Sequence, residues 1–123
     1  MIDSDEKLAQ WVPRIREANW LALDTEADSL HAYPEKLCLI QISLPGAEQL
    51  IDPLASLDLG PLLDALRGRE LVMHGADYDL RMLRRTYGFV PRAVFDTMLA
   101  ARLLGFVEFG LTSLVETLLG VHL

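Results

Sequence analysis

The segment WLALDTEAD at residues 20–28 joins an apolar run, residues 20–24, to an acidic end that contains Asp24 and Glu26. A short apolar run that stops at charged residues is typical of a β-strand. Side chains alternate between the two faces of a strand, so positions 24 and 26 are expected to point to the same side. The segment KLCLIQIS at residues 36–43 follows as a second, longer strand.

Apolar runs and helical periodicity alternate along the rest of the chain. The further elements expected are a capped helix that begins after Ser4, strands at residues 49–51, 70–74 and 94–96, and helices at residues 60–66, 76–87, 97–104 and 111–119. Pro13 lies inside the first helix and should kink or shorten it. A hairpin meander followed by alternating strands and helices predicts an α/β fold, with a mixed sheet flanked by helices.

The composition indicates a compact chain with no cysteine-based site. Its 123 residues suit one domain, residues 1–123, and 51% of them are hydrophobic, which is ample for a buried core. Trp11 and Trp20 are expected to anchor that core. Cys38 is the only cysteine, so an internal disulfide and a zinc finger are both excluded.

Charge and hydropathy limit the partners. The 18 Asp and Glu residues outnumber the 11 Lys and Arg residues, and the net charge of −7 argues against binding nucleic acid through bulk charge. Two other ways of binding nucleic acid stay open, through a local basic patch or through a metal ion that bridges the protein and a phosphate. Residues 1–7 are polar and acidic, unlike a signal peptide, and no apolar run has the length of a membrane span. We therefore expect a cytoplasmic protein with no membrane partner.

Asp24 and Glu26 form the first candidate site. Two like charges that converge are destabilising unless they share a proton or bind a cation. Mg²⁺ is the natural cation because it prefers carboxylate oxygens and keeps waters and phosphate as its other ligands. A strand end that enters an acidic turn explains the same two residues without any function, and the spacing alone favours that simpler interpretation.

A second acidic cluster stands in HGADYDLRML at residues 74–83, where a strand ends and a helix begins. The helix dipole stabilises acids in a first helical turn, so Asp77 and Asp79 have an ordinary explanation as capping residues. Asp79 is expected at the edge of the buried helix face, near the strand ends, and Asp77 in solvent. Asp96 precedes the next helix, and we interpret it as an N-cap.

Taken together, these segments resemble the 3′-to-5′ exonuclease domain of the ribonuclease D family, in the DEDDy branch of the DEDD exonucleases. The residues that carry the resemblance are WLALDTEAD (20–28), KLCLIQIS (36–43) with LIDP (50–53), LVMHGADYDLRML (71–83) and VFDTMLAARLLG (94–105). Each motif is weak by itself, but their order and spacing are specific. The resemblance implies a ribonuclease H-like fold, with an antiparallel meander and parallel strands in one sheet.

The resemblance also implies a function and a set of site residues. Asp24 and Glu26 correspond to the first acidic motif of the family and Asp79 to the second, which would give three carboxylates for two Mg²⁺ or Mn²⁺ ions. Asp24 would bridge the two ions, Glu26 would bind the ion that activates water, and Asp79 would serve the other. Asp77 and Asp96 would not be ligands. The activity implied is metal-dependent hydrolysis of phosphodiesters at RNA 3′ ends.

One part of the family pattern lies outside the 123 residues. The third motif of the ribonuclease D branch, a Tyr followed four residues later by Asp, is expected downstream of Leu123. We therefore interpret residues 1–123 as an incomplete exonuclease domain whose activity in this short form is in doubt. Truncation or proteolysis is the favoured explanation, and the alternatives are a naturally short product or a missing part that another chain supplies. Helices with an uncovered apolar face often self-associate, so a homo-oligomer is also expected.

Three functions stay open on the sequence alone. The first is an exoribonuclease acting on single-stranded RNA 3′ ends, with tRNA-like precursors as candidate substrates and DNA as an open alternative. The second is a catalytically inactive nucleic-acid-binding or scaffold module of the same fold. The third is an acidic-pocket domain of the phospho-acceptor type, in which Asp24 or Asp79 would be modified and a single metal ion bound. It ranks last because no suitable lysine follows Asp96.

Overall fold

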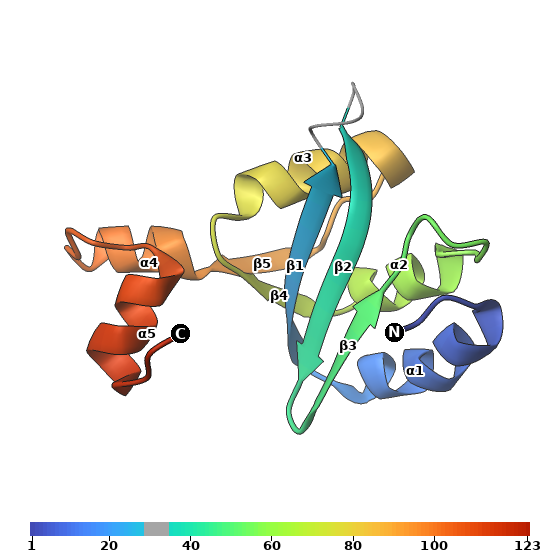
Figure 1. The fold of residues 1–123 in the computed structure, drawn as a ribbon, viewed down its shortest axis with the longest axis horizontal. Coiled ribbons are helices and arrows are strands. Elements are labelled where there is room, and N and C mark those ends of the chain that lie inside the picture. Colours follow the sequence, from blue (N-terminus) through green and yellow to red (C-terminus); the bar gives the residue numbers. More distant parts are fainter. Residues whose placement is uncertain (29–34) are drawn as a thin grey trace.

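The computed structural model describes residues 1–28 and 35–123. The strands are β1 (Trp20–Asp28), β2 (Lys36–Leu44), β3 (Ala47–Ile51), β4 (Glu70–Met73) and β5 (Ala93–Asp96), and the helices are α1 (Asp5–Glu17), α2 (Gly60–Arg67), α3 (Ala76–Tyr87), α4 (Thr97–Leu103) and α5 (Leu111–Leu119). In the described part of the chain the strands form one five-stranded sheet in the order β3-β2-β1-β4-β5 (Figure 1).

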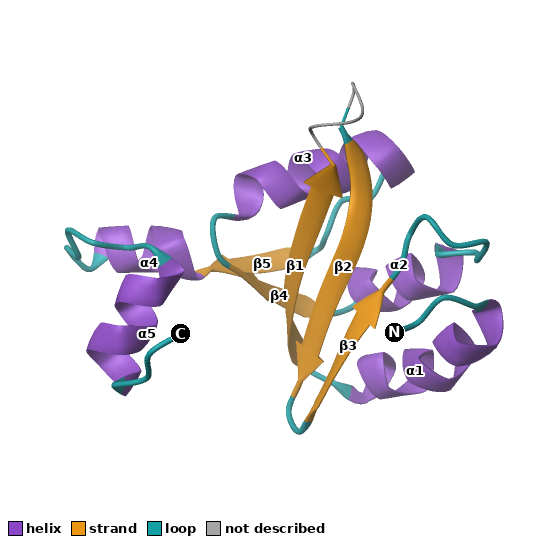
Figure 2. Ribbon diagram, in the orientation of Figure 1, coloured by secondary structure: helices purple, strands orange, loops and turns teal. Residues whose placement is uncertain are grey.

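The sheet is mixed, as predicted. Strand β1 pairs antiparallel with β2, and β2 pairs antiparallel with β3, which makes the expected meander. On its other side β1 pairs parallel with β4, and β4 pairs parallel with β5. Helix α3 connects the parallel neighbours β4 and β5, and the connection between the parallel neighbours β1 and β4 runs through β2, β3 and α2 (Figure 2). The α/β class is therefore confirmed, with β1 in the middle of the sheet.

One face of the sheet, here called the covered face, is buried under three helices. In β1 it is formed by Leu21, Leu23 and Thr25, which alternate with exposed or half-buried residues. The helix residues in the same buried cluster are Leu8, Trp11, Val12 and Ile15 of α1, Leu62, Leu63, Ala65 and Leu66 of α2, and Ala76, Met82 and Leu83 of α3. The hydrophobic core therefore lies between this face and α1, α2 and α3.

The opposite face, here called the open face, carries Trp20, Ala22, Asp24 and Glu26 of β1. Trp20 is 48% exposed there, so the prediction that it anchors the core is wrong, whereas Trp11 is buried as predicted. The alternation of a strand decides this outcome, because Trp20 is even-numbered like Asp24 and so shares its face. The sheet thus presents a partly apolar surface on the same side as the acids of β1.

Strand β1 extends further than its pattern predicts, and helix α1 is not shortened at Pro13. Strand β1 continues past the predicted end at Asp24, because its ladder with β2 runs on to the pair Asp28–Lys36. Helix α1 does not stop at Pro13 but continues to Glu17, with Ser4 accepting a hydrogen bond from the Lys7 N–H at its start. Tertiary pairing and packing extend both elements beyond the point where local preference would end them.

Helices α4 and α5 project to one side of the molecule, beyond the end of β5 (Figure 1). Their buried residues, Ala101 and Leu114, lie outside the main core cluster. Large apolar side chains are exposed along this segment, namely Leu99, Leu103, Leu104, Val107, Leu111, Leu118, Leu119, Val121 and Leu123. Within residues 1–28 and 35–123, no helix has both the length and the hydropathy needed to cross a bilayer.

Candidate active site

Asp24 and Glu26 lie where β1 has a neighbour on only one side. The parallel pairing of β1 with β4 ends at Ala22–Val72, whereas the antiparallel pairing with β2 continues beyond it. Both acids are exposed, and the residue between them, Thr25, is buried. The strand therefore delivers two carboxylates to the open face at the edge that β4 has left free.

A β-bulge in β2 lies opposite Glu26 and Ala27. Glu26 pairs with Leu39 and Ala27 pairs with Leu37, so Cys38 is the extra residue of β2 at this point. The Cys38 thiol lies 3.4 Å from the backbone oxygen of Glu26 and is half-buried. Bulges twist a strand locally and change the direction of nearby side chains. Here the bulge sets the backbone at Glu26.

Asp79 approaches the same stretch of β1 from helix α3. It is only 6% exposed and accepts a hydrogen bond from the hydroxyl of Thr25, which is also 6% exposed. The prediction that Asp79 lies at the edge of the buried helix face is thus confirmed. Thr25 was not predicted as a site residue. Its place between Asp24 and Glu26 in a strand nevertheless implies that its side chain points to the face opposite theirs.

The three acids influence each other electrostatically. Burial has the largest effect on Asp79 and raises the pKa of its carboxyl. The hydrogen bond from Thr25 lowers that pKa, but the negative charges of Asp24 and Glu26 raise it again, and the net shift is upward. Asp79 is therefore close enough to both acids of β1 for their charges to oppose its ionisation.

The other two acids singled out in the sequence have structural partners. The side chain of Asp77 is 83% exposed and forms a salt bridge of 2.8 Å with Arg81, one turn later in α3. Asp96 is the N-cap of α4 and accepts hydrogen bonds from the N–H groups of Met98 and Leu99, as predicted. Neither Asp77 nor Asp79 caps α3, because the N-cap position of that helix is Gly75.

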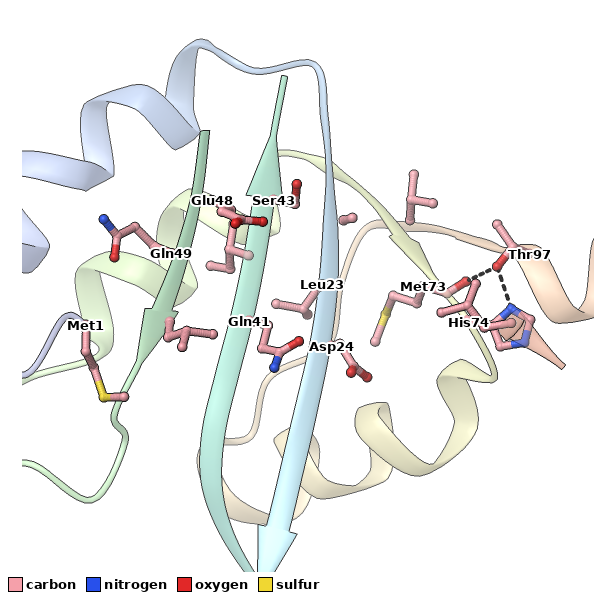
Figure 3. A pocket seen from close by; sticks show the side chains of 15 residues that line it. Met1, Leu23, Asp24, Gln41, Ser43, Glu48, Gln49, Met73, His74 and Thr97 are labelled. Atoms are coloured by element: carbon pink, nitrogen blue, oxygen red, sulfur yellow. Dashed lines mark hydrogen bonds between the residues drawn. The ribbon is translucent and has the colours of Figure 1, made fainter. Parts of the chain in front are cut away.

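A groove of about 850 Å³ runs across the open face beside Asp24 (Figure 3). Asp24 and Gln41 project into it from neighbouring strands, and His74 and Thr97 lie at one end, opposite Met1. The lining is partly polar, through Ser43 and Glu48 among others, and partly apolar. Glu26 and Asp79 do not line the groove, so of the three acids it is Asp24 that belongs to both the groove and the acidic cluster.

The three acids are candidate ligands for a cation. In residues 1–28 and 35–123, no three His, Cys, Asp or Glu side chains are grouped closely enough to hold a metal ion as they stand. The donor types nevertheless fit a hard divalent cation, because all three are carboxylates. The raised pKa of Asp79 in the field of Asp24 and Glu26 is a repulsion that a bound cation would relieve.

Comparison with known families and sequences gives a consistent result. A family model described as 3′-5′ exonuclease matches residues 1–123. The chain is 38% identical over 128 residues to ribonuclease D of Sphingobium indicum, with 100% of the chain and 33% of that relative covered. It is 34% identical over 119 residues to DNA polymerase I of Aquifex aeolicus, with 97% of the chain and 20% of that relative covered.

Solved structures show the same fold. The chain matches RNase D of Escherichia coli, described as an exoribonuclease involved in structured RNA processing, with a TM-score of 0.91 and 33% identity over 100% of the chain and 34% of that structure. The catalytic core of RRP6 from Trypanosoma brucei matches with a TM-score of 0.91 and 26% identity, covering 99% of the chain and 34% of that structure. The chain therefore spans about a third of the length of the ribonuclease D relatives.

Proposed function

The chain belongs to the 3′-5′ exonuclease family and is of the ribonuclease D type, and on that premise we propose that residues 1–123 belong to a single exonuclease domain that removes nucleotides from RNA 3′ ends with the help of divalent cations. The observation that carries the proposal is the juxtaposition of buried Asp79 with the two exposed acids of β1. Such a set of carboxylates is costly for folding and suited to a cation that binds phosphate.

Asp24, Glu26 and Asp79 would hold the cations, with Mg²⁺ or Mn²⁺ as the candidates and two ions as the expected number. When bound, such ions neutralise charge on a phosphodiester and make a water molecule more acidic. The chain's own part is to orient the ligands. Thr25 holds the Asp79 carboxyl against β1, and the bulge at Cys38 sets the backbone of Glu26.

A single strand of RNA is the substrate that the groove favours. The groove is open and runs beside Asp24, so a chain end could lie along it with its terminal phosphodiester near the acids. Gln41, Ser43 and His74 offer hydrogen-bonding groups along its length. The description of the Escherichia coli relative as an exoribonuclease for structured RNA supports RNA, with tRNA-like precursors as the first to test and DNA as the alternative.

The test is hydrolysis of single-stranded RNA labelled at its 5′ end, in Mg²⁺, Mn²⁺ or EDTA. We expect stepwise shortening from the 3′ end in either metal, none in EDTA, and a loss of at least about 100-fold in Asp24→Asn. Asp77→Asn is the matched control, because Asp77 is an exposed acid whose partner is Arg81. It should retain wild-type activity, and a DNA strand of the same sequence tests sugar preference.

The outcomes separate two functions. Binding of RNA without any shortening, in wild type and in Asp24→Asn alike, would reject the exonuclease proposal and support an inactive nucleic-acid-binding or scaffold module. Shortening that is equal in wild type and Asp24→Asn would reject the assignment of Asp24 as a ligand.

We also propose that copies of the chain associate through α4 and α5. Leu103 and Val107 are 88% and 90% exposed, and neighbouring leucines extend this apolar surface. Light scattering during gel filtration should give a mass above that of one chain, and Leu103→Glu with Val107→Glu should reduce it to one chain. A monomeric wild type would reject this association. The cytoplasmic location stays a prediction from the sequence.

A further inference from the structure

Helix α3, which carries Asp79, begins without a capping side chain of its own. Its N-cap residue is Gly75, in the left-handed region at a φ of 66°, and glycine has no side chain that could accept a hydrogen bond. The first N–H groups of a helix need acceptors from elsewhere. At this helix they find one in Asp96, which belongs to the end of β5. The N–H of Gly75 donates to Asp96 Oδ1 at 2.9 Å, and that of Ala76 donates to Oδ2 at 2.8 Å.

The same carboxylate caps a second helix. Asp96 Oδ1 also accepts from the N–H groups of Met98 at 2.9 Å and Leu99 at 3.4 Å, at the start of α4. Burial raises the pKa of the Asp96 carboxyl, but the hydrogen bonds from these backbone groups outweigh burial and lower the pKa below its ordinary value. One ionised side chain therefore joins the starts of α3 and α4.

Thr97 strengthens the same connection. Its hydroxyl donates a hydrogen bond to the backbone oxygen of Met73 at 3.1 Å, and it lies 2.8 Å from Nδ1 of His74 (Figure 3). Together Asp96 and Thr97 hold every residue from Met73 to Ala76, which is the whole turn between β4 and α3. The start of α3 is thus set by contacts from another part of the chain.

We propose that Asp96 is a positioning residue that places Asp79 against Thr25 and so sets the spacing of the three acids. The proposal rests on the proposed function, in which those acids hold cations. Asp79 lies in the first turn of α3, so a change in where this helix begins moves it directly. Asp96 touches neither cation nor substrate in this arrangement and acts through the helix.

The first test compares Asp96→Ser with Ser4→Ala by Mn²⁺ titration in a calorimeter. Serine can still cap α4 but is too short to reach Gly75 and Ala76. Ser4→Ala removes an N-cap from α1, far from the acids, and controls for a general loss of stability. We expect Mn²⁺ affinity to fall about tenfold in Asp96→Ser and to stay unchanged in Ser4→Ala. Equal affinity in the two variants, at a temperature where both are folded, would overturn the proposal.

A metal-free measurement keeps the proposal separate from the proposed function. In the absence of metal, the backbone amide resonances of Thr25 and Asp79 should shift in Asp96→Ser and remain in place in Ser4→Ala. If the wild type binds no Mn²⁺, the proposed function fails, and these resonances alone decide the role of Asp96. Unmoved resonances would reject it. If Asp96→Ser does not fold, Asp96→Asn replaces it, because the amide nitrogen that takes the place of Oδ2 cannot accept from Ala76.

Discussion

Thr25 connects β1 to α3 through a single buried hydroxyl. Its hydrogen bond to Asp79 is made between two side chains that are each 6% exposed. Thr25→Val keeps the shape but removes the donor, so the Asp79 carboxyl loses a partner in a place that water reaches poorly. We expect the free energy of unfolding to fall by about 1–3 kcal/mol, as measured by urea denaturation.

Thr25→Ser is the control, because it keeps the hydroxyl and removes only the methyl group. It should retain the Mn²⁺ affinity of the wild type, whereas Thr25→Val should weaken it. A valine variant with wild-type stability and wild-type Mn²⁺ affinity would mean that the hydroxyl does not hold Asp79 in solution.

The buried Asp79 makes stability depend on pH in a definite direction. Because its pKa is raised in the folded protein, the folded state binds the proton more tightly than the unfolded chain does. The free energy of unfolding therefore falls as the pH rises from 3.8, the ordinary value, through the raised value. In EDTA at neutral pH, Asp79→Asn should be more stable than wild type, since the buried charge is gone.

Urea denaturation at several pH values checks this, and the difference should shrink as the pH falls below 3.8, where wild-type Asp79 is protonated in both states. Addition of Mn²⁺ should stabilise the wild type and have little effect on the variant, because only the wild type has the full set of ligands. A variant that is less stable than wild type in EDTA at neutral pH would contradict the raised pKa.

His74 provides a prediction about a single proton. The Thr97 hydroxyl has one hydrogen, and it points to the Met73 carbonyl oxygen, so Thr97 must accept from Nδ1 of His74. Neutral His74 should therefore carry its proton on Nδ1 and leave Nε2 as an acceptor. Two-bond ¹H–¹⁵N correlation spectra distinguish the two tautomers. A spectrum typical of the Nε2–H tautomer would refute the assignment. In Thr97→Val, the preference of His74 for the Nδ1–H tautomer should be lost.

At this scale the sequence predicts what local rules control. The shared side of Asp24 and Glu26 follows from the alternation of a strand, and the N-cap role of Asp96 follows from its place before a helix. The bond between Thr25 and Asp79, and the second helix capped by Asp96, join residues that are distant in the chain. No local pattern contains them, so only the folded structure reveals them.

Among the elements, the turn into α3 depends on the backbone of Gly75. A methyl group at this position would meet the Met98 side chain at 3.6 Å, which is an ordinary contact, so strain at the positive φ is the main cost of a side chain. Gly75→Ala should lower the free energy of unfolding by about 1–2 kcal/mol. Urea denaturation of the wild type and the variant measures this difference.

Gly68→Ala is the matched control, because Gly68 has a φ of −86° and room for a methyl group. It should be neutral or stabilise the protein by up to about 1 kcal/mol. Equal destabilisation by both substitutions would indicate that the left-handed conformation of Gly75 is not what matters.

The order of the elements was predictable, whereas some of their ends were not. Helix α1 was expected to be kinked or shortened by Pro13, yet it reaches Glu17, where buried Ile15 packs in the core. Strand β1 outlasts its apolar run because β2 continues to supply hydrogen bonds up to Asp28. In both cases a partner from another part of the chain decides where the element stops, and local composition carries no record of that partner.

In the molecule as a whole, the sheet contains strand pairs that are close in sequence and strand pairs that are distant in sequence. Strands β1 and β2 pair with the strands that follow them in sequence, but β4 pairs with β1 only after the meander and α2 have been passed. Closing that longer loop costs more chain entropy, and local pairings generally form earlier.

The meander is therefore expected to be more structured than β4 in the folding transition state. Folding and unfolding rates of Ile40→Val and Leu71→Ala test this, since both residues are fully buried, one in β2 and the other in β4. The fraction of the stability change that appears in the folding rate should be larger for Ile40. A larger fraction for Leu71 would reverse the order.

The central place of β1 then has a consequence for how the acids come together in time. Asp24 and Glu26 belong to the hairpin that is expected to form first, and Asp79 would join them when α3 docks behind it. During synthesis the paired acids would leave the ribosome as part of a hairpin that is not yet joined by the third. The repulsion among the three acids would therefore arise late in folding, after the hairpin has formed. It would not oppose formation of the folding nucleus.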